Sequence, residues 1–168
     1  MIKKLLLTAL IAVPMCLCAQ TLKFGNVNSQ QIFETMPEKA VAEKTLVEVS
    51  KKYEDEYKKL QEEFTKKYTD FQALDAATPQ SIKDRRMQEL QENQTKIQNF
   101  QQMASQDLQK QQEALLAPIT EKLQKAIKAV GAENNFTYIF DLSIPAVVYS
   151  GAPSQDITPL VKAKLGLK

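Results

Sequence analysis

The sequence predicts an α+β protein, mainly α, in which a small β-sheet body carries a long protruding antiparallel helical hairpin, a coiled-coil-like arm. Three observations predict this fold class. Apolar residues recur with a period of eleven over residues 46–71, and a glutamine-rich helical segment follows. Short β-branched and aromatic segments lie near both ends of the chain. We therefore expect the two ends to meet in one sheet body, which assembles between chains.

The first segment, residues 1–19, is predicted to be a cleaved secretory signal peptide. Lys3 and Lys4 precede an apolar run over residues 5–13 that is too short to span a bilayer. Cleavage after Ala19 is preferred and cleavage after Cys18 is the alternative, whereas a lipid anchor at a cysteine would need small residues that the sequence lacks. Removing the segment also removes both cysteines and leaves 20 basic against 20 acidic residues from the original 22 and 20.

Composition argues against several classes of function. A nearly neutral mature chain does not favour binding to nucleic acid. The sequence contains no histidine, and with both cysteines removed the usual metal ligands and nucleophiles are missing, so we predict neither an enzyme nor a cofactor. The acidic clusters at 54–56 and 62–63 alternate with lysines around a helix, which is typical of a solvated face.

The elements of the first half follow from local patterns. Residues 22–27 roughly alternate and predict a short strand, and a helical turn through residues 31–33 should stop at Pro37. A long helix is predicted from Glu38 to residue 73 or 74. Its apolar stripe consists of Leu46, Val49, Tyr53, Tyr57, Leu60, Phe64, Tyr68 and Phe71.

The return helix should follow a break at residues 75–79, with Thr78 or Ser81 as its cap. It is predicted to run from about Gln80 past Leu116. A kink or restart is expected at Pro118, because proline lacks the N–H for the helical hydrogen bond, and Gly131 is the predicted terminator.

The C-terminal segment changes character. Residues 136–141 and 146–149 are aromatic and β-branched and predict two strands separated by a turn around residues 143–145. A last short helix should begin within residues 156–159, with Asp156 or Thr158 as its cap. The predicted division is a body of residues 20–37 and 117–168 and an arm of residues 38–116, with its tip near 74–82. A helix of about 38 residues is roughly 57 Å long, so the arm must project from so small a body.

At both ends the chain resembles the Skp/OmpH family of periplasmic chaperones. The opening 23–28, with Ile32, Phe33 and Pro37, is similar to the family's start, and residues 127–130, 138–141, 148–149 and 156–158 are similar to its ending. The resemblance implies a periplasmic homotrimer with a β-barrel-like body. It also implies three helical tentacles around a cavity that holds unfolded outer-membrane proteins.

The predicted function is that of an ATP-independent periplasmic holdase that prevents outer-membrane proteins from aggregating. Eleven glutamines between Gln80 and Gln112 dilute the apolar stripe of the return helix, which favours many weak contacts with an enclosed client. The alternative is a structural or adaptor coiled-coil protein of the cell envelope, for which longer and more regular stripes would be expected.

Three sets of candidate residues follow from this hypothesis. The client-binding candidates are Phe100, Met103 and Met87, unless they pack in the hairpin seam. A basic tip is a candidate contact for anionic lipid or lipopolysaccharide, unless it is an ordinary solvated helix end: Lys66, Lys67, Lys83, Arg85 and Arg86. The assembly body is predicted to involve Phe24, Val27, Tyr138, Ile139, Phe140, Val147 and Val148.

Overall fold

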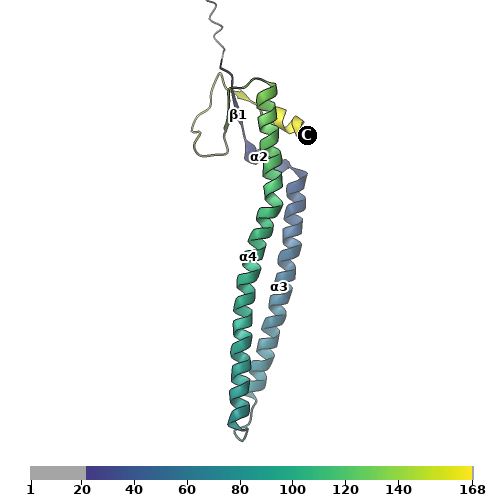
Figure 1. Ribbon diagram of the computed structural model, residues 1–168, viewed down its shortest axis with the longest axis vertical. Helices are drawn as coiled ribbons and strands as arrows, with labels where there is room; N and C mark the ends of the chain where they lie inside the picture. The colour runs from purple at the N-terminus through teal and green to yellow at the C-terminus, as the bar shows by residue number, and fades with distance from the viewer. Residues whose placement is uncertain (1–21, 168) are drawn as a thin grey trace, which may run out of the picture.

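The structure is a computed structural model that describes residues 22–167, and the predicted signal peptide lies outside the described residues. Within this range the elements are, in order, β1 (Phe24–Val27), α2 (Ser29–Thr35), α3 (Pro37–Gln72), α4 (Gln80–Glu133), β2 (Tyr138–Asp141), β3 (Gln155–Asp156) and α5 (Thr158–Lys164). A small body lies at one end and α3 and α4 form a long hairpin below it (Figure 1). The predicted α+β, mainly α, fold class is confirmed.

The hairpin pairs a helix of 36 residues with one of 54 residues. Pro37 occupies the start of α3, where its missing N–H costs nothing. The connecting loop, residues 73–79, is held by Asp75, whose backbone and side-chain oxygens accept hydrogen bonds from the Thr78 and Ala77 N–H groups. Because α4 is longer than α3, its C-terminal part continues past the start of α3 into the body, where it forms one wall of the core.

The helix continues past Pro118, because Ile119, Leu123 and other residues of the following turns pack in the core and hold the chain helical. One sequence prediction about α4 is wrong: the helix does not end at Gly131, which is buried within it. A Cβ atom there would lie 2.9 Å from Ile139 Cδ1, so the glycine permits close packing of β2.

The helix caps also differ in part from those predicted. Pro79 precedes α4 and makes no side-chain cap bond, so neither Thr78 nor Ser81 caps that helix. The N-cap position of α5 is Ile157, yet the Asp156 carboxylate accepts a hydrogen bond of 2.8 Å from the Thr158 N–H. Asp156 therefore satisfies a free donor of α5, as a capping side chain does.

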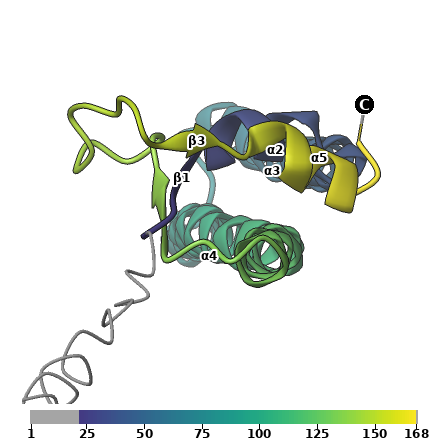
Figure 2. The same ribbon diagram turned by 90° about the horizontal axis from the view of Figure 1, so that it is seen from above.

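The sheet has the order β2-β1-β3, and both pairings are parallel. Phe24 is in register with Tyr138, and Gly25 with Gln155. The whole hairpin connects β1 to β2, so the sheet brings the two ends of the described chain together. Residues 142–154 then cross from β2 to β3 as a loop that projects away from the helices (Figure 2).

The predicted strand at residues 146–149 is therefore wrong. These residues have no regular structure, and the third strand is instead the short pair Gln155–Asp156. The central strand β1 is already paired on both sides, by β2 and by the short β3, and residues 146–149 do not extend the sheet at either of its outer strands. Val148 and Tyr149 are 95% and 86% exposed.

The hydrophobic core lies entirely in the body and at the root of the hairpin. β1, α2 and the residue after α2 contribute Val27, Ile32 and Met36. α5 and the residue before it contribute Ile157 and Val161. The facing residues of α3 and α4 are Ala42, Ile119, Leu123, Ala126 and Val130. None of the helices in residues 22–167 is long and apolar enough to cross a membrane.

Candidate functional site

The outer face of the sheet carries an exposed aromatic cluster. Residues alternate in burial along β1, so Gly25 and Val27 face the core and Phe24 faces outward. The Phe24 ring stacks on those of Tyr138 and Phe140 at centroid distances of 6.3 and 6.5 Å. Tyr138 is 60% and Phe140 43% exposed, so this cluster is held in one geometry while much of its area stays in contact with solvent.

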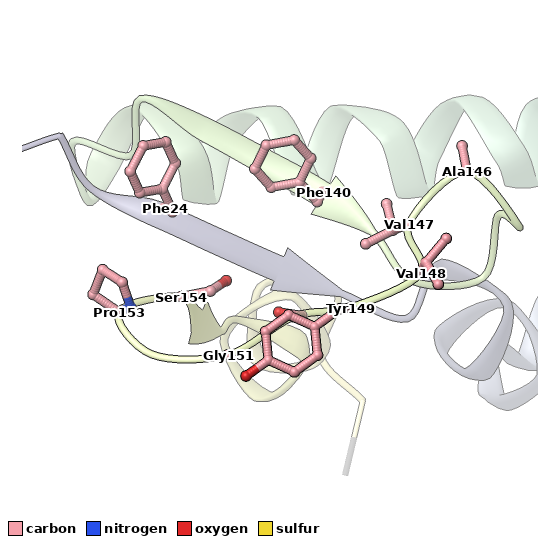
Figure 3. Close-up of a pocket in the computed structure, with 10 residues that line it drawn as sticks. Phe24, Phe140, Ala146, Val147, Val148, Tyr149, Gly151, Pro153 and Ser154 are labelled. Carbon is pink, nitrogen blue, oxygen red and sulfur yellow. The ribbon is translucent and has the colours of Figure 1, made fainter.

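The loop of residues 142–154 extends this apolar surface. A cavity of about 390 Å³ lies between the loop and the sheet, lined by Phe24, Phe140, Val147 and neighbouring loop residues (Figure 3). Asn26 of β1 fixes the far end of the loop by donating hydrogen bonds to Ser154 Oγ at 2.9 Å and Ser150 Oγ at 3.2 Å. Contiguous exposed apolar surface of this kind marks an interaction site.

The structure sorts the predicted assembly residues into two groups. Phe24, Tyr138, Phe140, Val147 and Val148 lie on the outer face or on the loop beside it. Val27 is 1% exposed and belongs to the core, and the half-buried Ile139 packs against that core. Sequence reasoning missed other exposed apolar loop residues, Leu142, Ile144 and Tyr149, although apolar side chains in a turn are themselves a signal.

The apolar stripe of α3 forms the seam of the hairpin, as its period predicts. Leu60 is 5% exposed, and its stripe neighbours are half-buried apart from Tyr68 at 46% exposure. Across the seam, the Tyr53 ring packs edge-on against Phe100 at a centroid distance of 6.0 Å. The predicted client contact Phe100 is thus half-buried within the seam.

Met87 and Met103, the other client-binding candidates, are 49% and 52% exposed. They lie sixteen residues apart on α4, which places them about 160° apart around the helix axis. They therefore flank the seam on opposite sides and do not form one continuous patch.

A polar contact joins the two helices beside Phe100. The Tyr53 hydroxyl donates a hydrogen bond of 2.6 Å to Asp107 Oδ2, which also accepts one from the Gln111 amide. The bond from Tyr53 is the main reason that the pKa of the Asp107 carboxyl is lowered, and the same carboxylate raises the pKa of the tyrosine. No pattern in the sequence indicates this contact, because it depends on how the two helices are aligned.

Replacing Tyr53 by Phe is expected to lower the stability of the arm with a characteristic pH dependence. The Asp107 pKa is depressed in the folded state, so its contribution is present above its unfolded pKa, about 3.9, and is lost as the pH falls through the folded value. The difference in melting temperature between wild type and Tyr53→Phe should stay constant from about pH 8 to 5 and shrink below pH 4. A difference that grows on acidification would contradict the assignment.

At the tip, acidic partners offset part of the predicted basic patch. Arg85 and Arg86 both contact Glu89, at 3.1 and 2.8 Å, and Arg86 is the main cause of the lowered pKa of that carboxyl. Lys83 donates to the Ala76 carbonyl at 3.1 Å. Lys66 is exposed and Lys67 half-buried.

Among residues 22–167, no group of three or more potential ligand side chains is arranged to hold a metal ion.

Comparison with known proteins gives one family. The family described as outer membrane protein (OmpH-like) matches residues 23–165, which is nearly all of the described chain. No curated protein matches the sequence. The match confirms the resemblance found at both ends of the sequence.

Proposed function

Because the chain belongs to the OmpH-like outer membrane protein family, we propose that it is an ATP-independent periplasmic holdase for unfolded outer-membrane proteins. The observation that carries the proposal is the combination of a long arm with a small body that exposes an aromatic face. The described arm is roughly 54 Å long, from 36 residues at 1.5 Å per residue. No element of the body within residues 22–167 covers the distal arm, so its surface is available to a client.

The proposal includes assembly of three copies through the sheet body. Tyr138, Phe140, Val148 and Tyr149 leave large apolar areas in water, and burying such area contributes about 25 cal/mol per Å². The loop at residues 146–149 has strong strand propensity but pairs with no strand of its own chain. A second copy supplies both a covering surface and an edge. The proposed number of copies, three, is taken from the resemblance to the Skp/OmpH family.

Assembly would arrange the arms around a shared cavity. Each arm presents scattered exposed apolar side chains, among them Val41, Val47, Met87 and Met103, on a largely polar surface. Individually these contacts are weak, but several arms acting on one client raise the total affinity while leaving it mobile.

The direct test is dilution of a urea-unfolded outer-membrane protein into buffer containing residues 20–168, without nucleotide. Light scattering from the client should stay low at a threefold molar excess of the chain. An equal mass of an unrelated two-stranded coiled coil is the control. Equal aggregation in both samples would refute the holdase function.

The tip is proposed as a contact for anionic headgroups. Replacing Lys83, Arg85 and Arg86 by Gln should reduce co-sedimentation with anionic vesicles severalfold, because each cation near such a surface contributes about 1 kcal/mol. The matched control replaces Lys51, Lys52 and Lys58, exposed residues of the middle of the arm, by Gln. Equal loss in both variants would show a general charge effect, and no loss in the tip variant would end the hypothesis.

A further inference from the structure

Asn93 is a polar residue at a seam position of α4. It shares one helix face with the half-buried Leu90, Ile97 and Phe100. With Asn93 included, successive members of this face are three or four residues apart. Its side-chain nitrogen is buried and has no hydrogen-bond partner within the described chain. An unsatisfied buried donor weakens the packing around it.

Among the described residues, the side-chain hydrogen bonds and ion pairs between α3 and α4 lie at Tyr53 and toward the root. At the root, Tyr53 bonds to Asp107 and Lys122 pairs with Glu38, so both contacts cross from one helix to the other. On the tip side, no side-chain hydrogen bond or ion pair among residues 54–106 joins α3 to α4. The Tyr57 and Tyr68 hydroxyls instead accept hydrogen bonds from glutamines of their own helix.

The loop at the tip is long enough to let the two helices separate. Packed helices lie about 8–10 Å apart, whereas the seven residues 73–79 can span up to roughly 23 Å when extended. Separation of the distal helices therefore requires no unfolding of either one.

We propose that the distal seam opens while the root stays closed, and that the exposed seam faces bind apolar segments of an unfolded polypeptide. This inference rests on the proposed holdase function and names its binding surface. Phe64 and Phe71 of α3 and Leu90 and Ile97 of α4 supply the apolar contacts. Asn93, unpaired in the closed seam, donates its amide to a carbonyl of the client backbone, which pairs the donor and favours the open, client-bound state.

The test closes the seam with Asn93→Leu, which removes the unpaired amide and adds apolar contact. Amide hydrogen exchange in the segments around residues 57–71 and 86–100 should slow about tenfold, and the amount of urea-diluted client held in solution should fall severalfold. The matched control is Asn99→Leu, which places the same side chain at an exposed position of the same helix. It should change neither measurement. Asn93→Met, with its flexible side chain, replaces the first variant if leucine reduces helix content.

Two results would overturn the inference. One is slower exchange in Asn93→Leu with client holding equal to that of wild type. The other is exchange that Asn93→Leu and Asn93→Met both leave unchanged. If the wild-type chain itself holds no client, the holdase proposal fails. If the wild type holds client and Asn93→Leu holds equally much, only the proposal that the seam binds the client fails.

Discussion

Replacing Tyr138 and Val148 by Asp should convert the proposed trimer into folded monomers. Both side chains are exposed in the single chain, at 60% and 95%, so their replacement leaves the core intact. In an assembly the same positions would be buried, and burying an unpaired carboxylate costs several kcal/mol. The measurement is the mass by light scattering on a sizing column, together with circular dichroism to show that helix content is retained.

The matched control for this assembly test is Val47→Asp with Met103→Asp. These residues are exposed to a similar degree, at 67% and 52%, but they lie on the arm. The control should keep the wild-type mass. An intact oligomer in the Tyr138→Asp and Val148→Asp variant would show that the outer face of the sheet is not the interface.

Replacing Leu60 and Phe64 by Ala should unfold much of the arm while leaving the assembly intact. Leu60 is the most buried side chain of the α3 stripe beyond the root, and a buried Leu→Ala change typically costs about 2–5 kcal/mol. Phe64, half-buried and stacked on Tyr68, adds a further loss. Helix content from circular dichroism should fall, whereas the mass of the assembly should not change.

The control for the arm test is Val41→Ala with Val47→Ala, two exposed positions on the same helix. It should retain wild-type helix content. Dissociation of the Leu60→Ala and Phe64→Ala variant into monomers would refute the proposal that the body, and not the arm, holds the chains together.

Local patterns were sufficient to predict most of the helical arm. The stripe from Leu46 to Phe71 predicted a helix beginning at Glu38, and α3 begins one residue earlier. This helix could be predicted because apolar residues three and four positions apart line one face of a helix, and this pattern is local in the sequence.

Tertiary packing overruled the local signals in the body. Pro118 lies inside α4, where Ile119 and Leu123 of the following turns pack in the core. Gly131 does not end α4 either, because it is buried where β2 packs against the helix. The strand predicted at residues 146–149 did not form, although its propensity is high, because the short β3 takes the remaining place beside β1. Propensity alone cannot reveal whether a partner strand exists.

The candidate site was predictable only in part. The sequence placed Phe24, Tyr138 and Phe140 in the body together with Val27, but it did not separate the exposed aromatic face from the core. The bond between Tyr53 and Asp107 and the buried amide of Asn93 depend on the alignment of two helices. The apolar pattern of one helix does not determine which of its residues lie opposite which residues of the other helix.

The holdase function is tested by the light-scattering mass of residues 20–168 on a sizing column, alone and after mixing with a urea-diluted outer-membrane protein. We expect a trimer that becomes a soluble complex of one trimer with one client. A stable assembly that leaves the client to aggregate would contradict the holdase function and would favour a structural adaptor of the cell envelope.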